Sequence, residues 1–203
     1  MLDPARKHRP TLLDDEPGAS RRLDFLKRCV DLAAALGARV VSTWSGAAPA
    51  GAPPPRVTER LVAGLSSLCA HAKGSGVRIG FEPEPGMAVE TVAGFERVRD
   101  AVRSPVLGLA FDVGHALATG EGDPAAIVRR HAKEIVVLQL DDHVRGRHDH
   151  KMFGEGEVDW PALATAVRAS GYDGPLEVEL SRHSSEAPEA ARRSIEFLRA
   201  LPW

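Results

Sequence analysis

The sequence is poor in cysteine, and it has no excess of basic charge. Two cysteines, Cys29 and Cys69, stand among 203 residues, with no CxxC pair and no zinc-ribbon spacing. This excludes a disulfide scaffold and a structural zinc module of that kind, and both cysteines are expected to be buried in helices. The formal net charge of −2 offers no cationic surface for phosphates, so no nucleic-acid partner is expected.

Long apolar runs are also missing. The N-terminal stretch MLDPARKHRPTLLDDEPG has no apolar segment of the length of a signal peptide, and no stretch approaches a membrane span. The sequence therefore predicts a cytoplasmic protein with reduced thiols and no membrane partner. Its composition, 43% apolar and 27% charged, is typical of one globular domain with a substantial core.

What the sequence does contain is a repeated alternation from about residue 20 onward. Segments with helical periodicity alternate with short β-branched runs and with loops rich in glycine, proline and charge. This pattern predicts βα units and a parallel sheet. The predicted strands are residues 39–44, 77–82, 106–112, 134–142 and 175–180. The predicted helices are residues 20–36, 58–73, 89–102, a short helix opened by Asp123-Pro124, a helix from Asp159-Trp-Pro161 to Gly171, and 185–201. The segment 46–56 is predicted to be a loop without helix.

Polar side chains gather at the carboxyl ends of the predicted strands, the edge at which parallel α/β folds bind their ligands. They are Trp44, Glu82, Glu84, Asp112, His115, Gln139, Asp141, Asp142 and Glu179. Converging carboxylates repel one another unless a cation or a proton holds them. Glu82, Asp112, Gln139 and Glu179 are therefore predicted to form an oxygen-rich metal site for Mn²⁺, Mg²⁺ or Co²⁺. Glu177 competes with Glu179, which is favoured because it lies nearer the strand end.

A second candidate site comes from histidines. The segment HVRGRHDHKMFGEGEVDW, residues 143–160, contains His148 and His150, and a DVGH turn after Asp112 carries His115. Any one of these histidines would more simply be an exposed loop residue. Together they would make a nitrogen-rich second site for Zn²⁺, or a set of donors for substrate hydroxyls or phosphate. The glycines of GEGE are expected to permit a turn with positive φ, and Glu157 to serve the approach to the next helix.

Four motifs, GFEPEPG, AFDVGHAL, LQLDDHVRGRHDHKMFGEGEVDW and GYDGPLEVEL, occur in an order and spacing that resemble the xylose isomerase-like TIM barrel superfamily. That group includes sugar phosphate isomerases and epimerases and endonuclease IV-like proteins, and the resemblance covers about residues 20–200. It implies a (β/α)8 TIM-barrel type of α/β fold and a metal-dependent sugar or polyol isomerase or epimerase of carbohydrate metabolism. The substrate would be a small hydroxylated carbonyl compound or a sugar phosphate.

The resemblance also assigns residues. Glu82, Asp112 and Glu179 match metal ligands of the superfamily, and Glu82 and Glu179 match its paired acid and base. Arg145 resembles an arginine that contacts substrate oxygens. His115, His148 and His150 resemble the further metal site of the endonuclease-like group, in which an aspartate stands at the position of His148.

Two departures from the superfamily pattern set the alternatives. Gln139 stands where the superfamily has a metal-binding histidine, and an amide oxygen is a weaker ligand for softer metals. The superfamily barrel has eight strands and about 250 residues, whereas five strands are predicted here. Residues 1–203 are therefore expected to form a single partial barrel that lacks its first strands. Its open edges would make it unstable, homo-oligomeric or inactive. An endonuclease IV-like phosphodiesterase, disfavoured by Trp44, and a noncatalytic degenerate barrel acting as a binding or assembly partner are the alternative functions.

Overall fold

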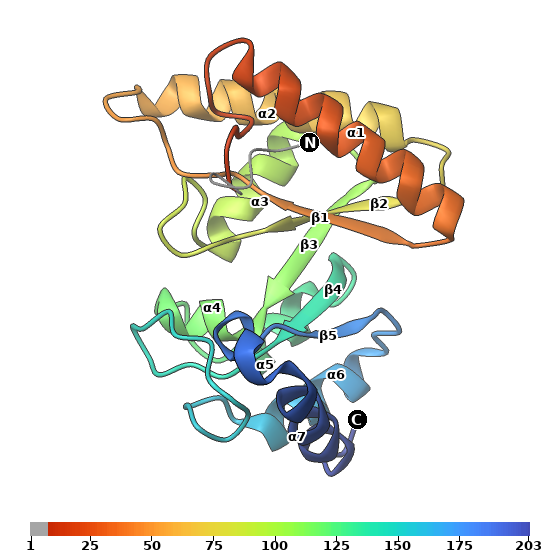
Figure 1. The fold of residues 1–203 in the computed structure, drawn as a ribbon, viewed down its shortest axis with the longest axis vertical. Helices are drawn as coiled ribbons and strands as arrows, with labels where there is room; N and C mark the ends of the chain where they lie inside the picture. The colour runs from red at the N-terminus through yellow and green to blue at the C-terminus, as the bar shows by residue number, and fades with distance from the viewer. Residues whose placement is uncertain (1–7) are drawn as a thin grey trace. The chain divides into compact units, whose positions relative to one another are not determined.

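The computed structural model describes residues 8–203 as five strands joined by helices (Figure 1). The strands are β1 Val40–Trp44, β2 Arg78–Glu82, β3 Leu107–Asp112, β4 Ile135–Leu140 and β5 Leu176–Val178. The helices are α1 Gly18–Leu36, α2 Pro54–Ala72, α3 Val92–Val102, α4 Val113–Ala118, α5 Pro124–His131, α6 Trp160–Ser170, the 3-10 helix η2 Ser181–Glu186, and α7 Ala187–Arg199. The strand order is the order in the chain, and helical crossovers connect the parallel pairs β1–β2, β2–β3 and β4–β5. This confirms the predicted TIM-barrel type of α/β fold.

The chain divides into two compact units, of which the first ends at Leu109 and the second is Ala110–Trp203. In the first unit β1 and β2 are parallel from Val40↔Arg78 to Trp44↔Glu82, and β2 and β3 are parallel from Ile79↔Leu107 to Phe81↔Leu109. Helices α1, α2 and α3 lie beside these strands (Figure 1). Their apolar faces supply the core of this unit, with Leu26, Val30, Leu61, Leu65, Leu68 and Phe95 buried.

Two helix starts in the first unit differ from the sequence prediction. Helix α2 begins at Pro54, so the prediction of an unbroken loop over residues 46–56 is wrong for its last three residues. Proline is accepted in the first turn of a helix because the N–H it lacks would have no partner there. Helix α3 begins at Val92, three residues later than predicted, because Thr91 caps it by accepting a hydrogen bond from the backbone N–H of Gly94 at 3.0 Å.

In the second unit β4 and β5 are parallel from Leu138↔Leu176 to Leu140↔Val178. The two predicted aspartate caps are confirmed. Asp123 accepts from the N–H of Ala125 at 2.9 Å, and Asp159 accepts from the N–H of Ala162 at 3.0 Å. Within residues 8–203 no helix combines the length and the apolar character needed to cross a membrane.

Helix α4 was not predicted, and it starts immediately after β3. Its N-cap is Asp112, whose Oδ1 accepts from the backbone N–H groups of Gly114 at 2.8 Å and His115 at 3.0 Å. The DVGH segment, expected to be a turn, is therefore the first turn of a short helix. One oxygen of Asp112 is committed to this cap, which fixes the carboxylate relative to His115.

Candidate metal and substrate site

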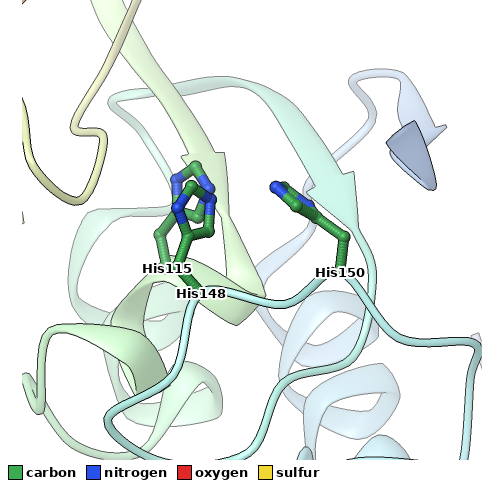
Figure 2. Close-up of side chains that lie close together, drawn as sticks. All are labelled: His115, His148 and His150. Carbon is green, nitrogen blue, oxygen red and sulfur yellow. The ribbon is translucent and has the colours of Figure 1, made fainter. Parts of the chain in front are cut away.

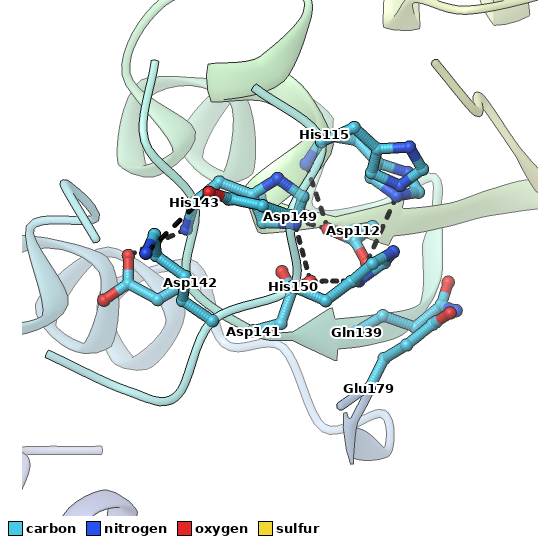
Figure 3. Close-up of polar contacts among 12 residues, drawn as sticks. Asp112, His115, Gln139, Asp141, Asp142, His143, Asp149, His150 and Glu179 are labelled. Carbon is cyan, nitrogen blue, oxygen red and sulfur yellow. Dashed lines mark hydrogen bonds and ion pairs between the residues drawn. The ribbon is translucent and has the colours of Figure 1, made fainter. Parts of the chain in front are cut away.

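Three oxygen-bearing side chains meet at the ends of β3, β4 and β5 in the second unit (Figure 3). Asp112 and Glu179 offer carboxylate oxygens within 4.8 Å of each other. Gln139 lies beside them, 8% exposed, and its Nε2 donates a hydrogen bond to Glu179 Oε2 at 2.6 Å. This bond orients the carboxylate of Glu179. Partial burial and the negative charge of Glu179 raise the pKa of Glu177, its competitor on the same strand.

The other end of the Gln139 amide indicates a ligand. Gln139 Oε1 is buried and has no hydrogen-bond partner among the residues that the structure describes. A buried carbonyl oxygen without a donor is costly, by about 1–3 kcal/mol. A hard divalent cation would satisfy it, and two carboxylates with one amide oxygen are suitable ligands for such an ion. The residues present therefore fit a divalent metal at Asp112, Gln139 and Glu179. Glu82 ends β2 in the first unit, and its part in the metal site stays a prediction.

The three histidines singled out in the sequence lie together in the second unit (Figure 2). One ring nitrogen of each lies within 4.8 Å of the others. The ring centroids of His148 are 4.8 Å from those of His115 and 4.6 Å from those of His150. Helix α4 positions His115, and the loop after β4 positions the other two. The structure thus brings together a nitrogen-rich set that adjoins the oxygen-rich one, with His115 Nε2 3.8 Å from Asp112 Oδ2.

Charge and backbone geometry at these histidines suit a ligand role. Burial, followed by the electrostatic effect of His150 and His143, lowers the pKa of His148 to about 4. His148 is therefore neutral near pH 7, with a lone pair for a metal or a hydroxyl. His150 has φ 43°, a left-handed conformation that costs a non-glycine residue about 1–2 kcal/mol. Strain of this kind is held in place by surrounding contacts and is concentrated at functional sites.

Sequence reasoning gave no role to Asp141 and passed over His143, both of which are 0% exposed. Asp141 Oδ2 accepts from His143 Nε2 at 2.7 Å and from His150 Nδ1 at 2.5 Å (Figure 3). His143 Nδ1 also donates, to the backbone carbonyl of Arg147 at 2.9 Å. Because both nitrogens of His143 face acceptors, the ring carries both protons. The signal that could have revealed them is the acid-acid-histidine run LDDH at the end of a buried strand.

The pKa shifts of this pair agree with its hydrogen bonds. Burial by itself would lower the pKa of His143, but the hydrogen bond and the charge of Asp141 outweigh it, and the pKa is raised. Burial would raise the pKa of Asp141, and the two histidines reverse this, so its pKa is lowered. Asp141, His143 and His150 also satisfy the distance condition for a metal site. Since both nitrogens of His143 already have acceptors, we interpret this set as a hydrogen-bonded network.

The neighbouring Asp142 has a different task, because it closes the loop that carries His148 and His150. Its carboxylate accepts four hydrogen bonds, from the backbone N–H groups of His143, Gly154 and Val158 and from the indole N–H of Trp160. Gly154 has positive φ, as expected for GEGE. Gly156 permits the backbone to approach Asp142 closely, since a β-carbon at this position would lie 2.2 Å from Asp142 Oδ1.

Arg145 lies on the exposed part of this loop. Its side chain is 58% exposed, and its Nε is 3.9 Å from Glu157 Oε2. An exposed ion pair of this length contributes little to stability, which leaves the guanidinium able to reach other acceptors. Its contact with substrate stays a prediction. Arg182, not singled out in the sequence, donates from Nη2 to the backbone carbonyl of His148 at 2.9 Å and ties this loop to η2.

Known proteins share sequence with this chain. A family described as the xylose isomerase-like TIM barrel matches residues 5–201. The chain belongs to this family. An inosose dehydratase of Lacticaseibacillus casei is 30% identical over 149 residues, which cover 64% of this chain and 49% of that protein. A 3-dehydroshikimate dehydratase of Pseudomonas aeruginosa is 30% identical over 193 residues, which cover 89% of this chain and 29% of that protein.

A solved structure shows the same fold. The IOLI protein, crystallised with a bound zinc atom, superposes with a TM-score of 0.76 over 90% of this chain and 69% of that chain, at 22% sequence identity. At that identity the likeness concerns the fold. The chain spans about half the length of the first curated relatives that it matches.

This xylose isomerase-like chain therefore carries two donor sets in its second unit. The oxygen set, Asp112, Gln139 and Glu179, has ligands that fit a divalent cation and includes a carboxylate oriented by the amide of Gln139. In the nitrogen set, which is His115, His148 and His150, the ring of His150 is hydrogen-bonded to Asp141, which His143 also contacts. Such an arrangement can hold divalent metal, bind hydroxyl or carbonyl oxygens, and move a proton at Glu179.

Proposed function

We propose that this xylose isomerase-like chain acts in a metal-dependent enzyme that removes the proton from the carbon next to the carbonyl of a small polyhydroxylated ketone. The observation that carries the proposal is the Gln139–Glu179 pair, in which an amide N–H orients a carboxylate and leaves a buried amide oxygen for a cation. The family and its two dehydratase relatives support it. Inosose and 3-dehydroshikimate are both ketones, and the loss of water from such a compound begins with the removal of the same proton.

Each residue of the oxygen set has a role in this proposal. A divalent cation held by Asp112, Gln139 and Glu179, and by Glu82 as the sequence predicts, would polarise the substrate carbonyl. Glu179 accepts the proton from carbon, and its hydrogen bond from Gln139 keeps one oxygen occupied and the carboxylate in a fixed orientation. Asp112 is held by the N-terminus of α4 and so presents its second oxygen without reorganisation.

The second proton transfer decides the product. If Glu82 returns a proton to the opposite face of the same carbon, the product is an epimer, as the sequence resemblance implies. If an acid protonates the hydroxyl on the neighbouring carbon, water leaves and the product is an unsaturated ketone. Both outcomes share the first step at Glu179, so one experiment on that step tests the proposal for either product.

His115, His148 and His150 are proposed to hold a second divalent ion. Three imidazoles form the donor set that Zn²⁺ prefers, with one position left open for a substrate oxygen or water. The neutral state of His148 supports this, because a ligating imidazole must be unprotonated. The alternative for this set, direct hydrogen bonding to substrate hydroxyls or phosphate, predicts no bound metal.

The decisive assay is deuterium exchange from D₂O into inosose and other small hydroxyketones, followed by NMR in the presence of Mn²⁺, Co²⁺ or Zn²⁺. We expect Glu179→Gln to reduce exchange by about 100-fold or more, the usual contribution of a general base. Glu177→Gln is the matched control, because it makes the same change on the same strand and should leave exchange within about threefold of the wild type. Undiminished exchange in Glu179→Gln, or none in the metal-loaded wild type, would overturn the proposal.

A further inference from the structure

We propose that Asp141 is a positioning residue that fixes which nitrogen His150 presents to the three-histidine set. It does so by accepting the Nδ1–H of His150, so that the other nitrogen, Nε2, keeps its lone pair toward His115 and His148. The metal-binding consequence rests on the function proposed above. The orientation of the ring stands on the hydrogen bonds of the second unit by themselves.

The hydrogen-bond geometry fixes the tautomer. His150 Nδ1 lies 2.5 Å from Asp141 Oδ2, and because an aspartate carboxylate only accepts, the imidazole is the donor. A neutral imidazole carries one proton, so a proton on Nδ1 leaves Nε2 bare. Metal-binding histidines usually donate their second nitrogen to a carboxylate in this way, which sets both tautomer and ring orientation.

His143 holds Asp141 in place from the other side. Its Nε2 donates to the same oxygen, Asp141 Oδ2, while its Nδ1 is bound to the carbonyl of Arg147. Asp141 Oδ1 is buried and has no hydrogen bond within the described part of the chain. The two histidines therefore account for the hydrogen bonds of this carboxylate, and His143 anchors it to the loop that carries His150.

The same pair also supports His115. A β-carbon at Gly114, the residue before His115, would lie 2.1 Å from His143 Cδ2 and 2.3 Å from Asp141 Oδ1. The first turn of α4 thus rests directly on the Asp141–His143 pair, and only glycine permits this approach. Asp141 contacts the helix that carries one histidine of the set and binds the ring of another. A change at Asp141 is expected to disturb the set from both sides.

The first test reads the His150 tautomer in metal-free protein by long-range ¹H–¹⁵N NMR at a pH near 8. We expect the wild type to carry its proton on Nδ1. In Asp141→Ala the acceptor is gone, and we expect a population with the proton on Nε2. Asp141→Asn keeps an acceptor oxygen and should restore the Nδ1–H form. A wild-type His150 protonated on Nε2, or an unchanged tautomer in Asp141→Ala, would overturn the proposal.

The second test measures affinity for Co²⁺ by its visible absorption, in competition with a chelator. Asp141→Ala is expected to lose about 10- to 100-fold in affinity, as second partners of metal ligands do, and Asp141→Asn clearly less. Asp149→Ala is the matched control, because Asp149 stands between His148 and His150, has the exposed Arg147 and the half-buried Lys151 as ion-pair partners, and carries the same charge. An equal loss in Asp149→Ala would show a general charge effect and reject the positioning role.

The two tests separate this proposal from the proposed function. If wild-type protein binds no Co²⁺ or Zn²⁺, the metal site fails, and the NMR comparison of wild type with Asp141→Ala still decides the role of Asp141. If Asp141→Ala does not fold, the tautomer of the wild type and the affinity of Asp141→Asn decide it. An Nε2–H tautomer in the wild type, or a loss of affinity of about 10-fold or more in Asp141→Asn, then counts against it.

Discussion

Replacement of Asp142 by asparagine tests how the histidine-bearing loop is held. Asp142 is 0% exposed, and each of its oxygens accepts two hydrogen bonds. Oδ1 accepts from the N–H groups of His143 at 3.0 Å and Val158 at 3.1 Å. Oδ2 accepts from the N–H of Gly154 at 2.9 Å and from Trp160 Nε1 at 3.1 Å. Asparagine replaces one oxygen with an NH₂ group, which donates, so two of the four donors face another donor whichever way the amide turns.

The expected cost follows from those two donors. A buried donor left without an acceptor costs about 1–3 kcal/mol, so the substitution should lower the free energy of unfolding by about 2–6 kcal/mol. This is a large part of the roughly 5–15 kcal/mol that stabilises a typical domain. Asp159→Asn is the matched control, because it makes the same change at a helix N-cap where asparagine and aspartate are equally good, and it should cost less than about 0.5 kcal/mol.

The assay is urea unfolding followed by far-UV circular dichroism, for wild type, Asp142→Asn, Trp160→Phe and the double variant. Trp160→Phe removes one of the four donors. In that background Asp142→Asn therefore leaves one donor without an acceptor, where it leaves two in the wild type. We expect the cost of Asp142→Asn to be smaller there by about 1–3 kcal/mol. Additive effects, or an Asp142→Asn cost no larger than that of Asp159→Asn, would refute the interpretation of Asp142 as the buried anchor of this loop.

Three further predictions concern the histidine cluster and its support. The pKa of His148 is about 4 in the folded protein and ordinarily 6.5, so on acidification the unfolded chain binds a proton first. The stability of metal-free protein should therefore fall between about pH 6.5 and pH 4. His148→Gln should remove this part of the pH dependence of the urea midpoint. The pKa of His143 is raised in the folded protein, so its effect on stability has the opposite pH dependence. Its contribution to the free energy of unfolding is complete below about pH 6.5 and is lost as pH rises through the folded pKa. His143→Gln should reduce this loss of stability at higher pH, and an unchanged loss would contradict the prediction. Gly114→Ala places a carbon 2.1 Å from His143 Cδ2, and thermal unfolding should show a lower midpoint; a change within about 2 °C would show that the turn yields easily.

Much of the architecture could be predicted from the sequence because its signals are local. The alternation of helical and β-branched periods predicted five strands in their places, each within two residues of its observed ends. Asp123-Pro124 and Asp159-Trp-Pro161 located helix starts because a cap and a proline in the first turn are satisfied by their own neighbours. The start of α2 at Pro54 was missed although the same rule applies there, since three consecutive prolines favoured a loop.

The sequence predicted which residues belong to the candidate site, but not the hydrogen bonds that they make. The strand ends indicated Asp112, Gln139 and Glu179, because the carboxyl ends of parallel strands share one edge. Spacing showed that His148 and His150 share a loop. The hydrogen bond from the amide of Gln139 to Glu179 could not be predicted, because it depends on the direction of side chains 40 residues apart. The cap of α4 by Asp112 is local and was missed because DVGH was interpreted as a turn.

The adjacent residues Asp141 and Asp142 show most clearly what the sequence determines and what only the tertiary structure decides. In the sequence they are two identical acids at the end of one strand, and the sequence by itself determined only that both would lie at the edge where ligands bind. The tertiary structure decided that Asp141 supports the histidines and that Asp142 anchors the loop. The physical reason is that successive side chains of extended backbone point to opposite sides. The partners on each side are His143 and His150 for Asp141, and Gly154 and Trp160 for Asp142. They reach these positions only when residues 143–160 fold back on β4.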